Sequence, residues 1–80
     1  MELEVIKLDS RYKDVDSKLI QVENNKYLLE TNSEYVRLSR AENRTIYSID
    51  LEGGPMIGIG DTIQGKKIKN IKSQYVIEFE

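Results

Sequence analysis

The 80-residue sequence has no cysteine, no histidine and no tryptophan, and it has only one proline. Without cysteine the chain can form neither a disulfide framework nor a thiolate metal site. Without histidine it lacks the commonest general base and the usual ligand of zinc and iron. We therefore expect no metal, no cofactor and no enzymatic activity, although aspartate, glutamate, lysine and tyrosine side chains can also serve in catalysis.

Length, charge and hydropathy narrow the class of protein further. A chain of 80 residues buries only about 60–65% of its unfolded surface, which predicts a single domain over 1–80 with one modest core. The net charge of −2 points to neither a nucleic-acid nor a membrane partner. No apolar run approaches the length of a membrane span, and residues 1–8 alternate charged with apolar side chains, unlike a signal peptide. We predict an intracellular, cytoplasmic protein.

The residues that are abundant favour strands. Isoleucine, valine and tyrosine dominate the apolar set, whereas alanine occurs once. Such side chains suit a pleated, half-buried surface better than a helix. We expect an all-β domain, a small antiparallel barrel or sandwich of six to seven short strands. It would consist of a four-stranded meander over 18–51 and a C-terminal hairpin over 66–80.

The meander prediction rests on three turns. Asn24-Asn25 suits a two-residue hairpin turn, because asparagine tolerates positive φ. Asn32-Ser33 is predicted to close a second hairpin, and the loop 41–44 a third. Each turn sets a register, and the three registers agree on one apolar face, made by Ile20, Val22, Tyr27, Leu29, Val36, Leu38, Tyr47 and Ile49.

The opposite face of the predicted meander is mostly polar. Leu19, Leu28 and Tyr35 interrupt it, next to Arg37. One interpretation is that these are surface hydrophobic residues of the ordinary scattered kind. The other is that Leu19, Leu28, Tyr35 and Arg37 form a contact surface for a partner protein.

All five glycines and the proline fall between residues 53 and 65, and Gly53-Gly54-Pro55 is expected to end the meander. Residues 60–66 match the G-x-x-x-x-G-K pattern of a phosphate loop, but Lys67 stands where the motif needs serine or threonine. We interpret Gly60 and Gly65 as turn residues between strands. Backbone amides of this segment could also cradle an anion.

The C-terminal part is basic, with no acidic residue between Thr62 and Ile77. Single-stranded nucleic acids are bound by positive charges that contact the backbone and by aromatic side chains that stack on bases. This part of the chain contains both kinds of side chain, namely Lys66, Lys67, Lys69, Lys72 and Tyr75. The alternative is that these lysines protect an exposed edge strand from pairing with another chain.

From these observations we expect a non-enzymatic protein-interaction or assembly module that binds a protein partner or a second copy of itself. Small domains with modest cores often gain stability in this way. One setting for such a domain is a structural or accessory protein of a phage-like genome. The alternative is nucleic-acid or nucleotide binding through the basic strand 66–72, Tyr75 and the glycine-rich segment 53–65.

Overall fold

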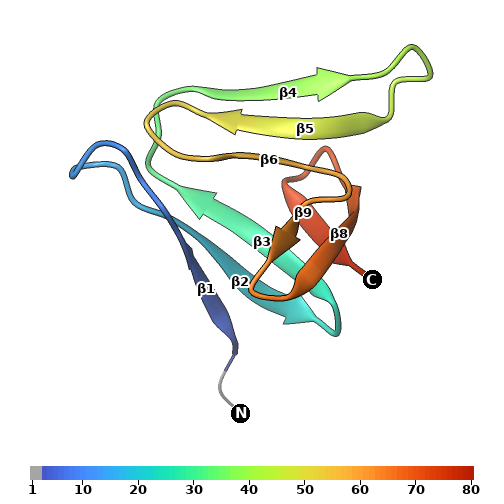
Figure 1. Ribbon diagram of the computed structural model, residues 1–80, viewed down its shortest axis with the longest axis horizontal. Helices are drawn as coiled ribbons and strands as arrows, with labels where there is room; N and C mark the ends of the chain where they lie inside the picture. The colour runs from blue at the N-terminus through green and yellow to red at the C-terminus, as the bar shows by residue number, and fades with distance from the viewer. Residues whose placement is uncertain (1–2) are drawn as a thin grey trace.

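The computed structural model describes residues 3–80 and confirms the all-β prediction (Figure 1). Within these described residues, nine strands form a curled antiparallel sheet, open like a half-barrel, and a small second sheet. Their bounds are β1 Val5–Leu8, β2 Ser17–Glu23, β3 Lys26–Thr31, β4 Val36–Arg40, β5 Ile46–Leu51, β6 Met56–Gly58, β7 Thr62–Ile63, β8 Lys66–Ile71 and β9 Val76–Phe79. The number of strands is larger than the predicted six to seven because the glycine-rich segment forms β6 and β7. The described residues contain no helix that could span a membrane.

The chain divides its strands between two sheets. The curled sheet has the order β1-β2-β3-β9-β8-β7, and the second sheet has the order β4-β5-β6. Figure 1 shows the second sheet lying across one end of the curled sheet, with the β4–β5 hairpin reaching beyond it. The chain therefore leaves the curled sheet after β3, builds the second sheet and returns with β7 to β9.

The predicted hairpin at Asn32-Ser33 is wrong, because β3 pairs with β9 and not with β4. The Ser33 hydroxyl shares its single proton between the carbonyl oxygens of Tyr35, 3.0 Å from Oγ, and Glu52, 2.8 Å from Oγ. Asn32 Nδ2 donates to the Asp14 carbonyl at 2.9 Å. Because these side chains form hydrogen bonds with other segments, the chain crosses to the second sheet and does not reverse direction here. The continuous four-stranded meander over 18–51 is accordingly split in two.

The first turn forms at Asn24-Asn25, but only Asn25 has the positive φ that the predicted type I′ turn needs at both residues, and a bulge changes the register of β2. Asn25 has a φ of 63°, and Glu23 pairs with Lys26. The register then shifts between Gln21 and Glu23, so that Leu19 pairs with Leu29. One extra residue in a strand moves the side chains of the preceding part of that strand to the opposite face of the sheet. Leu19 is therefore buried at 0% exposure, and its expected place on the water-exposed face is wrong.

The β4–β5 hairpin is displaced by two residues from the predicted register. Leu38 pairs with Ile49 and not with Tyr47. A two-residue shift preserves the faces of a strand, so Leu38 still packs against the core. A register shift between Ser39 and Arg40 leaves Tyr47 outside the pairing and 51% exposed. Tyr47 is consequently not part of the predicted apolar face.

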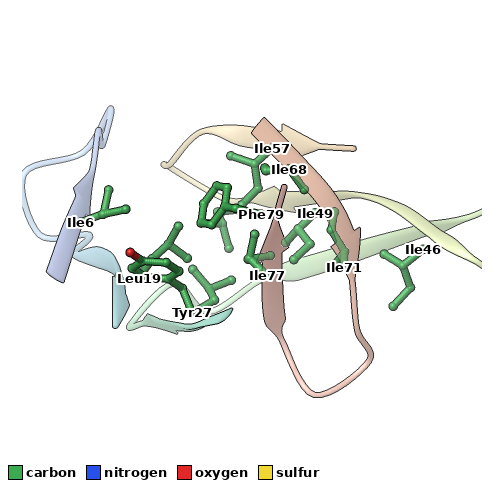
Figure 2. Packing of buried hydrophobic residues seen from close by; sticks show 12 residues of the cluster. Ile6, Leu19, Tyr27, Ile46, Ile49, Ile57, Ile68, Ile71, Ile77 and Phe79 are labelled. Carbon is green, nitrogen blue, oxygen red and sulfur yellow. The ribbon is translucent and has the colours of Figure 1, made fainter. Parts of the chain in front are cut away.

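The core lies between the concave side of the curled sheet and the inner side of the second sheet (Figure 2). The Tyr27 and Phe79 rings meet edge to face, with centroids 5.2 Å apart. Such aromatic pairs contribute about 0.5–1.5 kcal/mol beyond the area they bury. The buried apolar cluster consists of Ile6, Leu19, Tyr27, Leu29, Ile46, Ile49, Leu51, Ile57, Ile68, Ile71, Ile77 and Phe79.

The glycine-rich segment contains turns, as predicted. Gln64 and Gly65 join β7 to β8 with φ values of 49° and 80°, the positive pair that a type I′ hairpin turn needs. The residues that match G-x-x-x-x-G-K therefore form a strand, a turn and the start of another strand. Gly53, Gly54 and Pro55 occupy the connection between β5 and β6, and Gly60 has a φ of 92° in the connection to β7. The predicted C-terminal hairpin of β8 and β9 is also present.

The two ends of the curled sheet are joined by side chains. Glu4, just before β1, accepts a hydrogen bond from the Tyr27 hydroxyl at 2.8 Å and one from Lys66 Nζ at 3.0 Å. Lys66 belongs to β8, near the other end of the strand order. An ion pair thus bridges the opening of the half-barrel.

Candidate protein-interaction surfaces

A row of apolar side chains crosses the outer, convex face of the curled sheet. Val5 pairs with Ile20, Ile20 pairs with Leu28, and Leu28 pairs with Val76. In each strand the neighbouring residue on the chain is buried in the core, so these four side chains point away from it. We call the set Val5, Ile20, Leu28 and Val76 the outer apolar row.

The outer apolar row is accessible to a partner. Val5 is 53% exposed and Leu28 is 36% exposed, while Ile20 and Val76 are half-buried. Leu3 and Val22, which are also exposed, extend the apolar surface toward the ends of β1 and β2. A contiguous apolar patch of this kind often marks an interaction site, whereas single exposed hydrophobic residues need no explanation.

Charged residues flank the outer apolar row on both sides. On one side Lys7 pairs with Lys18, and Lys18 pairs with Glu30, whose carboxylate lies 3.7 Å from Lys18 Nζ. On the other side Lys26 pairs with Glu78. An apolar strip between polar borders has the layout of a protein interface, with an apolar centre and a polar rim.

The residues predicted to form a protein contact do not lie on one surface. Leu28 belongs to the outer apolar row, but Leu19 is in the core. Tyr35 and Arg37 lie on the second sheet, where they line a groove together with Tyr12. Val5, Ile20 and Val76 were missed because only the correct strand pairing brings them to Leu28. In the sequence these residues can be recognised because each is an apolar residue directly beside a core residue in β1, β2 or β9.

Two of the four lysines predicted to contact nucleic acid have carboxylate partners within the protein. Lys66 is paired with Glu4, and Lys67 Nζ lies 4.0 Å from a Glu80 carboxylate oxygen. Lys69 and Lys72 are exposed. Tyr75 has a φ of 63°, precedes β9 and lines a hollow with Leu29 and Val36, and its amide donates to the Lys72 carbonyl at 2.9 Å.

Glu78 compensates part of the basic charge. A hydrogen bond from Asn70 Nδ2, 2.8 Å long, is the main cause that lowers the pKa of the Glu78 carboxyl. The positive charges of Lys69, Lys72 and Lys26 lower this pKa as well. The carboxylate therefore stays ionised among the lysines, which reduces the positive potential available to a polyanion.

Within the glycine-rich segment, the main-chain amides of residues 58–61 have partners inside the protein. The Gly58 amide donates to Asp61 Oδ2 at 2.7 Å. The amides of Ile59, Gly60 and Asp61 donate to main-chain carbonyls of Tyr47, Ile68 and Gly58. Since these four consecutive amides have partners inside the protein, the expectation that this stretch cradles an anion is corrected.

The comparisons with known proteins give no relative. No family model, no curated protein and no solved structure matches the chain.

Proposed function

We propose that this protein is a self-associating interaction module, in which two copies pack the outer faces of their curled sheets together. The observation that supports the proposal is the outer apolar row, which runs unbroken over the adjacent strands β1, β2, β3 and β9. Face-to-face packing of two sheets buries such a row in the way that a β-sandwich buries its inner faces.

One pair of charges beside the row, on either side of Leu28, is complementary in such a dimer. A two-fold axis parallel to the row places the residue two positions before Leu28 in one copy over the residue two positions after it in the other. These residues are Lys26 and Glu30, which carry opposite charges. A two-fold interface uses the same patch twice, so this self-complementarity supports a second copy as the partner.

The test is sedimentation equilibrium over micromolar to millimolar concentrations. The native protein is expected to dimerise. Leu28→Lys is expected to raise the dimer dissociation constant at least about tenfold, because a charge then faces the apolar centre of the interface. Tyr47→Lys is the matched control, since Tyr47 is also exposed but lies on β5, away from the row.

A charge exchange tests the arrangement itself. Glu30→Lys should weaken the dimer, and adding Lys26→Glu should restore it, because the pair is then complementary again. A monomer at every concentration, or a Leu28→Lys variant that associates like the native protein, would contradict the proposal. A salt-dependent complex with a single-stranded oligonucleotide, lost when Lys69 and Lys72 become glutamate, would favour nucleic-acid binding instead.

A further inference from the structure

The outer face of the second sheet carries a groove that self-association through the curled sheet does not use. Tyr12, in the loop before β2, is 56% exposed, and Tyr35, just before β4, is 71% exposed. Both line a groove of about 390 Å³. A tyrosine ring is a large, rigid and amphipathic contact surface that loses little conformational entropy when it binds. We call this feature the tyrosine groove.

Main-chain hydrogen bonds hold the walls of the tyrosine groove together. The Arg11 amide donates to the Gly53 carbonyl at 2.5 Å, and the Glu52 amide donates to the Tyr35 carbonyl at 3.1 Å. The Ser33 side chain adds to these bonds, because its hydroxyl proton is shared between the carbonyls of Tyr35 and Glu52. Three segments, namely the loop before β2, the start of β4 and the end of β5, are thus joined before any ligand arrives. Such pre-organisation lowers the cost of binding.

Gly53 leaves the space that the Tyr12 ring occupies. Its φ is 77°, and a Cβ atom at this position would overlap the Tyr12 ring. The ring therefore packs directly on the main chain of the β5–β6 connection. An exposed aromatic ring that is fixed in this way is a recognition surface more than a mobile side chain.

The charges along the groove are unequal. Arg37 lies opposite Asp50 across the β4–β5 pairing, and no ion pair among the described residues joins the arginines of the groove to its carboxylates. Beside Tyr12 the groove continues into a hollow of about 410 Å³ that is lined by Asp14, Glu34 and Glu52, without a basic residue. This end suits a cationic side chain and disfavours a phosphate.

We propose that the tyrosine groove binds an extended, proline-rich peptide that carries an arginine or lysine. Tyr12 and Tyr35 would pack against the proline rings, and the carboxylates of Asp14, Glu34 and Glu52 would pair with the cation. The walls are side chains of an outer sheet face, so main-chain pairing with an added strand contributes nothing there. A polyproline II peptide needs no such pairing, because its backbone stays solvated and its shape is preformed.

The experiment is an NMR titration of the isotope-labelled full chain with a peptide of eight prolines followed by two arginines. Amide shifts are expected at Tyr12, Tyr35 and Gly53. Tyr35→Ala should raise the dissociation constant at least about tenfold, the loss typical of an interface anchor. Because Tyr35 is exposed, its truncation removes no core packing, and a dispersed spectrum of the variant verifies the fold. Tyr47→Ala, an exposed tyrosine outside the groove, should bind like the native chain.

Two further peptides separate the contributions. Replacing the two arginines by glutamates should weaken binding at least about tenfold, and so should replacing the prolines by alternating glycine and serine. No shifts at millimolar peptide, equal binding of the glycine-serine peptide, or an unaffected Tyr35→Ala variant would each overturn the proposal. The Leu28→Lys variant should bind the peptide normally, so failure of the peptide site is distinguishable from failure of self-association.

Discussion

Tyr27 connects more parts of the molecule than its place in a short hairpin suggests. Its ring is 1% exposed and packs on Phe79, and its hydroxyl donates to Glu4, which in turn pairs with Lys66. Burial, together with the hydrogen bond to the Glu4 carboxylate and its negative charge, raises the pKa of Tyr27 to about 12. The folded state therefore keeps this phenol neutral in a pH range where the unfolded chain ionises it.

Replacing Tyr27 by phenylalanine tests this linkage. Near pH 8, Tyr27→Phe should cost about 1 kcal/mol, since Glu4 loses a hydrogen-bond donor. Between the unfolded pKa of 10.0 and the folded pKa of about 12, the unfolded native chain binds fewer protons than the folded one. The free energy of unfolding of the native protein therefore falls as the pH rises, and this part of the fall is missing in the variant. Urea unfolding of both proteins at about pH 8 and about pH 11 should show that the difference between their free energies of unfolding shrinks or reverses at the higher pH. A difference that does not change with pH would contradict the account.

At the level of strands, local chemistry predicts turns better than registers. Asn24-Asn25 and the β8–β9 hairpin follow from turn residues and alternation, and both are present. The bulge beside Val22 does not follow, because an extra unpaired residue is favoured by packing of Leu19 and Tyr27 against other strands. Asn32-Ser33 has the composition of a hairpin turn, yet its side chains bind distant segments. What sequence cannot supply is the identity of those tertiary partners.

Deletion of Val22 tests whether the core determines the β2 register. The residue is the surplus one at the bulge and is 49% exposed, so its removal should leave Leu19 opposite Leu29. We expect the free energy of unfolding to change by less than about 1 kcal/mol. Deletion of Leu28 is the comparison, because it turns Leu29 out of the core in a strand without a bulge and should cost at least about 2 kcal/mol. Both variants are followed by urea denaturation. If both deletions unfold the protein, the bulge itself is required.

For the whole molecule, the candidate site was predictable only in part. Leu28, Tyr35 and Arg37 stand out in the sequence as interruptions of a polar face, but the structure places Leu28 on one sheet and the other two residues on the second sheet. The outer apolar row and the tyrosine groove share no residue. Association through the outer apolar row would leave the tyrosine groove of each copy open. A dimer would then present two grooves, and two linked peptides would bind it more tightly than one.

In the proposed dimer, the outer apolar rows of the two copies are in contact. The most direct measurement is an isotope-filtered NOE experiment on an equal mixture of labelled and unlabelled protein. We expect intermolecular NOEs that connect the methyl groups of Val5, Ile20, Leu28 and Val76 in one copy with the same set in the other. A dimer whose intermolecular NOEs fall elsewhere, or a sample at millimolar concentration without any, would contradict the claim.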